Sequence, residues 1–198
     1  MSDWIDRQLV RRGIRDERVL AAMRRVPREL FVPEEARGHA YDDAALPIGY
    51  GQTISQPFIV ALIASALGVR EGDRVLDVGT GSGYQAAVLA ELAGEVLSIE
   101  LIPELSDQAR RSLAAAGYLD RVELRVGNGR GGVPERAPFD AIAVAAAADA
   151  APPALLEQLA PGGRLVIPLG ETLFAADPSG GLRALAPVRF VPLVDYPR

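Results

Sequence analysis

Apolar residues recur with helical spacing in the first part of the chain. Between residues 3 and 25 they follow the three-to-four period of amphipathic helices, with an interruption at Gly13. Asp16 is suited to cap the second of these helices. After an irregular stretch that contains several prolines, residues 56–67 are again helical in pattern, with Pro57 in the first turn. The pattern predicts an N-terminal helical cap.

From residue 74 onward, short apolar runs alternate with amphipathic segments. The alternation predicts right-handed crossovers and a mostly parallel sheet covered on both faces. The expected strands are 74–78, 95–100, 122–126, 139–145, 164–168 and 189–194, and the expected helices are 84–92, 103–116 and 152–159. We therefore expect a doubly wound α/β fold. It would form a single domain over residues 1–198, with 1–68 as the N-terminal cap and 69–198 as the α/β core.

Composition narrows the class of protein. Hydrophobic residues make up 49% of the chain and charged residues 24%, a balance typical of globular domains. The net charge of -5 argues against nucleic-acid binding, which needs a concentrated positive field. Cysteine is absent and His39 is the sole histidine, so we expect no metal site. No apolar run approaches the roughly 18 residues of a membrane helix, and the first residues lack an apolar signal core. These features predict a cytoplasmic protein without membrane partners.

The strongest chemical signal lies between the first predicted strand and the helix that follows it. Glycines at alternate positions let the backbone turn tightly and approach a ligand closely, and the helix start presents free N–H groups. In an open parallel sheet, ligands bind at such a position. The segment reads Asp77, Val78, Gly79, Thr80, Gly81, Ser82, Gly83 and Tyr84.

The spacing of these glycines argues against a nicotinamide dehydrogenase. A dinucleotide-binding loop prefers Gly-x-Gly-x-x-Gly, whereas Tyr84 occupies the place of that third glycine. Glu100 ends the second predicted strand, where a carboxylate can accept both ribose hydroxyls of an adenosine. After the third strand, Asn128 and Gly129 have two interpretations. The amide can meet an adenine ring, or the pair can form a simple turn.

Asp77, the three glycines and Glu100 together resemble the cofactor-binding motifs of class I S-adenosylmethionine-dependent methyltransferases. The resemblance implies that S-adenosylmethionine is the cofactor, with its amino-acid tail and sulfonium packed against the loop. In methyltransferases of this type, the loop after the third strand contacts the adenine, commonly through an aspartate. This chain has Asn128 there, with Gly129 beside it.

The segment 46–58, before the glycine loop, reads locally as a loop followed by a helix start. Ser55 is placed to cap the helix that Pro57 opens, which would be a purely structural role. However, this segment and five others, in order along the chain, resemble protein-L-isoaspartate O-methyltransferases of bacteria. The segments are 26–33, 46–58, 79–84, 137–140, 162–164 and 188–193.

This resemblance implies methyl transfer from S-adenosylmethionine to the α-carboxylate of L-isoaspartyl residues in damaged proteins or peptides. The implied activity is that of a protein-L-isoaspartate (D-aspartate) O-methyltransferase, whose methyl ester product would collapse to a succinimide that hydrolysis partly returns to aspartate. The resemblance places the Ser55 hydroxyl beside the accepting carboxylate, as the active-site residue. Gln52, Thr53 and Ile54 are expected to shape the substrate pocket, although stabilisation of a turn explains Gln52 and Thr53 equally well. On this interpretation 1–68 carries the substrate segment and 69–198 the cofactor-binding core.

The chemistry requires no catalytic base, because a carboxylate is already deprotonated at neutral pH and a methyl sulfonium is already activated. Alignment of the reacting atoms and exclusion of water are sufficient. The chain departs from the family at three places: at Asn128, in the segment 144–149, which would face the peptide, and in 171–185, which predicts a shortened C-terminal strand pair. They leave two alternatives open, a carboxyl methyltransferase acting on aspartyl groups of a biosynthetic peptide and a degenerate binding domain. We favour a monomer, although the sequence does not determine the oligomeric state.

Overall fold

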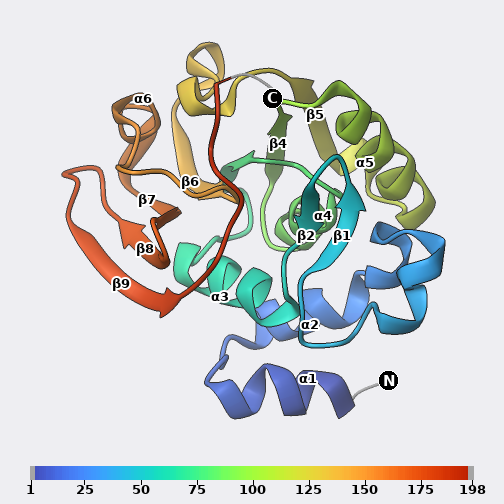
Figure 1. The fold of residues 1–198 in the computed structure, drawn as a ribbon. Helices are drawn as coiled ribbons and strands as arrows, with labels where there is room; N and C mark the ends of the chain where they lie inside the picture. The colour runs from blue at the N-terminus through green and yellow to red at the C-terminus, as the bar shows by residue number, and fades with distance from the viewer. Residues whose placement is uncertain (1–2, 196–198) are drawn as a thin grey trace.

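The computed structural model describes residues 3–195, and the N-terminal part of the chain is helical (Figure 1). It contains α1 (Asp3–Gln8), the 3-10 helix η1 (Val10–Arg12) and α2 (Glu17–Arg25). The side chain of Asp16 accepts hydrogen bonds from the backbone N–H groups of Arg18 and Val19, at 2.9 and 3.4 Å. The predicted helix cap is therefore confirmed.

A short β-hairpin follows the N-terminal helices, in a stretch that the sequence predicts to be only a loop. The intervening elements are the 3-10 helices η2 (Arg28–Phe31) and η3 (Glu34–His39) and the strands β1 (Leu46–Gly49) and β2 (Gln52–Ile54). The hairpin turn runs through Gly49, Tyr50 and Gly51, which have φ angles of 92°, 54° and 70°. Three successive left-handed residues explain the two glycines. Strands this short carry too little alternation to be recognised in a sequence.

Seven strands form one sheet in the order β5-β4-β3-β6-β7-β8-β9, and only the last two pairings are antiparallel. The strands are β3 (Arg74–Val78), β4 (Glu95–Glu100), β5 (Val122–Val126), β6 (Phe139–Val144), β7 (Leu159–Leu169), β8 (Thr172–Ala176) and β9 (Leu182–Pro187). The helices of this part are α3 (Pro57–Leu67), α4 (Tyr84–Ala90), α5 (Pro103–Ala116) and α6 (Pro153–Leu156), with short 3-10 segments at η4 (Leu119–Arg121), η5 (Gly129–Gly131) and η6 (Pro134–Arg136). The predicted doubly wound, mostly parallel α/β fold is confirmed.

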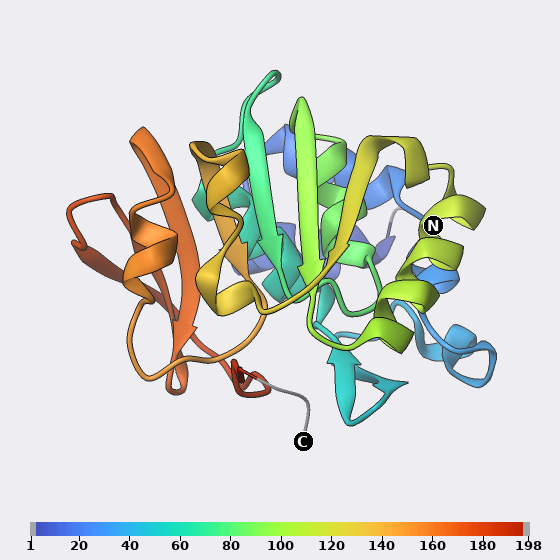
Figure 2. The ribbon, with the colours of Figure 1, turned by 90° about the horizontal axis from the view of Figure 1, so that it is seen from above.

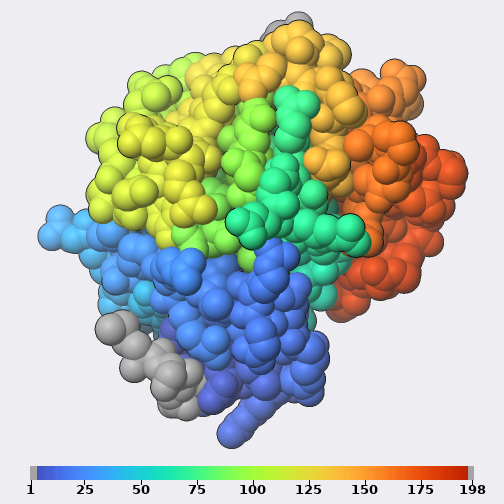
Figure 3. All heavy atoms as spheres, turned by 180° about the vertical axis from the view of Figure 1, so that it is seen from behind, coloured from blue at the N-terminus to red at the C-terminus, as the bar shows by residue number. Residues whose placement is uncertain are grey.

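The two faces of the sheet bury two separate sets of apolar side chains. Val75 and Val96 belong to the larger core, which continues into the N-terminal helices and α3, α4 and α5. Leu76 and Leu97 belong to the second core, on the face that α6 covers. Seen from behind, the N-terminal residues (blue) lie directly against residues from the middle of the chain (teal and green) (Figure 3). Among the described residues, no helix combines the length and apolar character needed to cross a membrane.

The C-terminal third differs from the prediction in its boundaries. The predicted strand 189–194 is wrong: β9 precedes it, and 189–194 leaves the sheet to run across the carboxyl ends of the strands. Two hydrogen bonds attach the segment to Ala147. The Ala147 N–H donates to the Val191 carbonyl at 2.8 Å, and the Leu193 N–H donates to the Ala147 carbonyl at 2.7 Å. Pro192 cannot donate to a strand ladder, which explains why the segment forms only an isolated bridge.

Two further elements have boundaries that differ from the prediction. The predicted helix 152–159 shrinks to the four residues of α6, and β7 begins five residues before the predicted strand 164–168. The early start of β7 is accommodated by an irregular register with β6 between Phe139 and Ala141. The expected C-terminal strand pair is present as β8, with five residues, and β9, with six.

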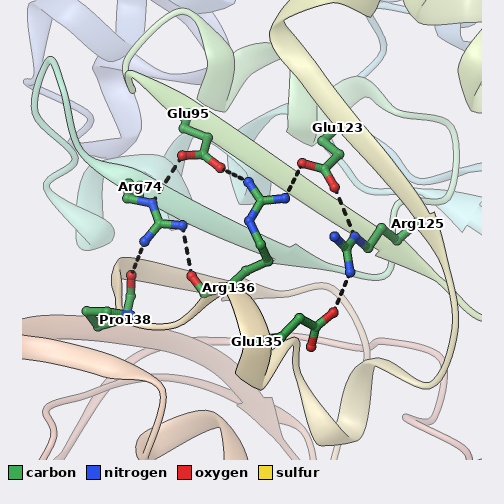
Figure 4. Close-up of polar contacts among 7 residues, drawn as sticks. All are labelled: Arg74, Glu95, Glu123, Arg125, Glu135, Arg136 and Pro138. Atoms are coloured by element: carbon green, nitrogen blue, oxygen red, sulfur yellow. Dashed lines mark hydrogen bonds and ion pairs between the residues drawn. The ribbon is translucent and has the colours of Figure 1, made fainter.

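A network of ion pairs closes the amino-terminal edge of the sheet (Figure 4). Arg136 pairs with both Glu95 and Glu123, and Arg74 pairs with Glu95 at 3.1 Å. Arg74 also donates to the backbone carbonyls of Arg136 and Pro138, at 2.8 and 3.0 Å. The network therefore ties the segment after η6 to the first residues of β3 and β4. It lies at the edge opposite to the carboxyl ends of the strands.

Candidate active site

The carboxyl ends of β3 and β6 line a cavity of about 860 Å³. β3 pairs with β4 on one side and with β6 on the other, so the chain reverses its direction of travel through the sheet at this point. Open α/β sheets bind ligands in such a crevice. Figure 2 shows the β1–β2 hairpin (cyan) and the end of the chain (red) beyond the arrowheads of the central strands. Residues of both segments line the cavity.

The glycine loop forms one wall of this cavity. Gly79, Thr80, Gly81 and Ser82 line it, as predicted for ligand-binding residues. Gly79, Gly81 and Gly83 all have positive φ angles, which only glycine adopts without strain. Gly83 does not line the cavity, because it packs against α5: a Cβ atom there would lie 3.2 Å from Leu113. Gly83 therefore acts in packing the loop rather than in direct contact.

Glu100 faces the cavity from the end of β4, where the sequence predicts it. It is only 6% exposed. Its Oε2 accepts a hydrogen bond from the Gly81 N–H at 2.8 Å, and its Oε1 accepts one from the Ile102 N–H at 3.0 Å. Each carboxylate oxygen has a second lone pair, so both remain able to accept from ligand hydroxyls. The carboxylate thus joins the glycine loop to the second strand at the cavity wall.

Asp77 occupies a different place from the one predicted, because it lies beneath the loop and does not line the cavity. Its side chain is 0% exposed. It accepts hydrogen bonds from Gln85 Nε2 at 2.8 Å and from Ser98 Oγ at 2.7 Å. Since the Ser98 proton is committed to Asp77, the hydroxyl of Thr80 donates to Ser98, at 2.6 Å. Asp77 therefore positions the loop through Ser98 and Thr80.

Burial, together with the smaller effect of the nearby negative charge of Glu100, raises the pKa of Asp77 to about 6, although the hydrogen bonds from Gln85 and Ser98 oppose the shift. The folded-state pKa lies above the unfolded value of 3.8. The folded protein therefore binds more protons than the unfolded chain between these values. The contribution of this group to the free energy of unfolding consequently falls as pH rises from about 4 through about 6.

Replacement of Asp77 by Asn is expected to remove this pH dependence. Relative to wild type, the free energy of unfolding of D77N should rise by up to about 2–3 kcal/mol between about pH 4 and pH 7, at about 1.4 kcal/mol per pKa unit. The Asn amide can donate to the Gln85 Oε1 atom, which is buried without a hydrogen-bond partner among the described residues. Urea unfolding across this pH range measures the difference. D107N, at an exposed position of α5, is the control, and a pH-independent difference for D77N would refute the argument.

Ser55 lines the cavity, together with Gln52, Thr53 and Ile54. The prediction that Ser55 caps the following helix is wrong: the residue before α3 is Gln56, and no side chain caps that helix. Ser55 lies one position too early, because Pro57 is already the first helical residue. Within residues 3–195 the Ser55 hydroxyl makes no hydrogen bond, so it is available to a ligand. All four predicted substrate residues therefore share one wall.

Asn128 does not line the cavity and instead stabilises a turn. Its Oδ1 accepts a hydrogen bond from the Arg130 N–H at 2.9 Å, which caps η5. Its Nδ2 donates to Asp195 Oδ1 at 3.1 Å. Gly129 does line the cavity, and a Cβ atom there would lie 2.5 Å from the Val78 side chain. The loop after β5 thus meets the cavity through Gly129, and the turn interpretation describes Asn128.

Several lining residues were not predicted individually as site residues, although the sequence placed the segment 144–149 facing the peptide. Ala145 and Ala146 follow β6 at the crevice, and residues 187–194 cross above it. The parallel sheet implies the first pair, since the carboxyl ends of adjacent strands meet at one edge. Residues 189–194 were predicted as a strand, so the place of this segment over the cavity depends on the tertiary structure.

The cavity fits an adenosine-containing zwitterion. Gly79 and Gly81 leave room for close approach of the ligand, and Glu100 offers acceptors for ribose hydroxyls. The glycine loop presents no cationic side chain of the kind that binds a pyrophosphate. A doubly wound sheet with this loop and this acid defines a class I S-adenosylmethionine-dependent methyltransferase.

Comparison with known proteins specifies the family. The family model for protein-L-isoaspartate(D-aspartate) O-methyltransferase matches residues 2–197, and the chain belongs to this family. It is 55% identical, over 95% of its length and 84% of the relative's, to the protein-L-isoaspartate O-methyltransferase of Opitutus terrae. The family and the enzyme class predicted from the sequence are therefore confirmed.

Solved structures agree with this assignment. A crystal structure of a protein-L-isoaspartate O-methyltransferase from Plasmodium falciparum, in complex with S-adenosyl-L-homocysteine, has a TM-score of 0.83 and 28% identity and covers 98% of both chains. Another protein-L-isoaspartate O-methyltransferase has a TM-score of 0.84 and 29% identity, over 97% of this chain and 65% of that one. The predicted cofactor, S-adenosylmethionine, is confirmed at the level of the family.

Proposed function

We propose that the protein transfers the methyl group of S-adenosylmethionine to the α-carboxylate of L-isoaspartyl residues in damaged proteins or peptides. One observation carries this proposal. The Ser55 hydroxyl, which is without a hydrogen-bond partner among the described residues, opens into the same cavity as the glycine loop and Glu100. A carboxylate at Ser55 and a cofactor at the loop would therefore share one enclosed space.

The assigned roles follow from this arrangement. Glu100 would accept the ribose hydroxyls, and residues 79–82 with Gly129 would line the rest of the cofactor site. S-adenosylmethionine supplies an activated methyl group when bound. Asp77 and Gly83 would support the loop from behind, and Asn128 would hold the turn that presents Gly129. These are roles in positioning.

The reaction needs alignment rather than a base. A carboxylate oxygen forms a bond to the methyl carbon while the carbon–sulfur bond breaks and its electron pair stays on sulfur, which becomes neutral. No proton is transferred. The Ser55 hydroxyl can donate to one carboxylate oxygen and so direct the other. The hairpin and residues 187–194 line the cavity and would limit the access of water to the bound reactants.

A methylation assay tests the proposal directly. The purified protein is incubated with labelled S-adenosylmethionine and with matched peptides that contain either L-isoaspartate or L-aspartate at one position. We expect base-labile methyl incorporation into the isoaspartyl peptide. Preference for the aspartyl peptide would instead support a carboxyl methyltransferase of a biosynthetic peptide. No incorporation, together with no heat of S-adenosylhomocysteine binding in calorimetry, would support a non-catalytic binding domain.

Replacement of Ser55 by Ala is expected to lower kcat/KM for the isoaspartyl peptide about tenfold or more, because one charge-assisted hydrogen bond to the carboxylate is lost. The dissociation constant for S-adenosylhomocysteine should change less than about twofold, since among the described residues Ser55 makes no hydrogen bond to the glycine loop. Steady-state kinetics and calorimetry measure the two quantities. S65A is a matched control, because Ser65 lies on α3 and does not line the cavity. Equal losses of turnover and cofactor affinity in S55A would show a structural role.

A further inference from the structure

Arg28 is an arginine buried inside the protein. It begins η2 and is 0% exposed. Its Nε donates to the backbone carbonyl of Ala40 and its Nη2 to the backbone carbonyl of Ser55, both at 2.7 Å. The guanidinium carbon also lies 4.8 Å from the centre of the Tyr84 ring. The side chain thus joins the N-terminal cap to the substrate wall of the cavity.

The charge of Arg28 has no counterion among the described residues. The neighbouring carboxylate, Glu29, accepts a hydrogen bond from the Tyr41 hydroxyl instead. The Nη1 atom of Arg28 is buried and has no hydrogen-bond partner within residues 3–195. Burial of an unpaired charge is costly, and backbone carbonyls and an aromatic ring offset only part of that cost. A negative group that binds near this cation would offset the rest of that cost.

The charge of Arg28 lies next to residues that line the cavity. Ser55 and Tyr84 both line the cavity, and the guanidinium contacts both from behind. The arginine that lines the cavity itself, Arg189, has a side chain 91% exposed and lies 3.8 Å from Glu171. An exposed charge of this kind is screened by salt, whereas a buried one is screened much less.

We propose that Arg28 is a positioning residue that makes the site at Ser55 selective for an anionic group. It holds the Ser55 backbone through its carbonyl, and its unpaired charge favours a carboxylate over a neutral carboxamide at the Ser55 hydroxyl. The inference rests on the proposed function, because it concerns the recognition of the same substrate carboxylate.

The test compares two peptides that differ only in charge at the reacting group. One contains L-isoaspartate and the other has its α-carboxylate replaced by a carboxamide. The ratio of their affinities, from KM and from competitive inhibition, measures the selectivity. We expect R28M to lower this ratio about tenfold and R28K to retain more of it than R28M, since lysine keeps the charge. Affinity for S-adenosylhomocysteine should stay within about twofold of wild type.

R18M is the matched control, because Arg18 also donates to two backbone carbonyls, those of Val69 and Leu92, but lies away from the cavity. It should leave the selectivity ratio unchanged. If R28M weakens the binding of both peptides equally, or if R18M lowers the affinity ratio as much as R28M does, the role of Arg28 is overturned while the proposed function stands. A wild-type protein that methylates no isoaspartyl peptide would overturn the proposed function first.

A measurement on the wild-type protein covers the case in which R28M does not fold. Because the charge of Arg28 is buried, the preference for the carboxylate peptide should fall less than about threefold between about 0.05 and 0.5 M salt. A preference that disappears at high salt would assign the selectivity to exposed charges and overturn the inference.

Discussion

Replacement of Glu100 by Gln is expected to raise the dissociation constant for S-adenosylhomocysteine about 30-fold, equivalent to about 2 kcal/mol. The Glu100 carboxylate accepts from the backbone N–H groups of both Gly81 and Ile102. Gln has one acceptor oxygen, so its amino group would face one of these N–H donors. The variant loses an acceptor for the ribose and also loosens the glycine loop that Glu100 holds.

Titration calorimetry with S-adenosylhomocysteine measures the change. The matched control is E104Q, since Glu104 lies four positions further along the chain and is exposed in the first turn of α5. E104Q removes the same charge and should leave the affinity within about twofold of wild type. An E100Q variant that binds as tightly as wild type would show that Glu100 serves only to shape the turn after β4.

Replacement of Gly94 by Ala is expected to lower the free energy of unfolding by about 2–4 kcal/mol. A Cβ atom at this position would lie 2.7 Å from Cα of Gly72 and 2.9 Å from its carbonyl carbon. Both contacts are to backbone, so no side-chain rotation relieves them. The Gly94 N–H also donates to the Asp73 carbonyl at 3.0 Å, which holds the two turns together. These turns lead into β3 and β4 at the amino-terminal edge of the sheet.

Thermal and urea unfolding measure this loss, which corresponds to a decrease in Tm of roughly 4–16 °C for a chain of this size. G38A is the control, because a Cβ atom at Gly38 meets nothing within 4 Å and Gly38 does not have a positive φ angle. At a temperature where G94A is folded, its affinity for S-adenosylhomocysteine should match wild type, since the clash is at the edge opposite to the cavity. Unchanged stability of G94A would mean that the two turns separate at little cost.

Strand and helix positions could largely be predicted where the pattern is long and local. The strands β3, β4 and β5 and the helix α5 have the predicted boundaries. Apolar runs mark the strands, and a proline at the start and a glycine after the end mark α5, and these signals act locally. The prediction of residues 189–194 as a strand failed for a physical reason. An apolar run is compatible with a strand, but it is equally compatible with a segment that covers a cavity.

The orientation of polar side chains was less predictable than their position in the sequence. Asp77 and Glu100 both belong to the motif, yet only Glu100 reaches the cavity. Asp77 shares the strand face of Val75, which α4 covers, and it therefore lies under the loop. Arg28 is the extreme case, since its partners Ala40 and Ser55 lie 12 and 27 positions away along the chain.

The sequence by itself determined the order of the elements, the glycine loop and the acid at the end of β4, because periodicity and the steric needs of glycine are local properties. It also carried the family resemblance that the comparisons confirm. Only the tertiary structure decided which motif residues face the ligand. That choice depends on which strand face a helix covers, and on contacts between segments as distant as Arg28 and Ser55. Such contacts form only when burial of apolar surface brings the segments together.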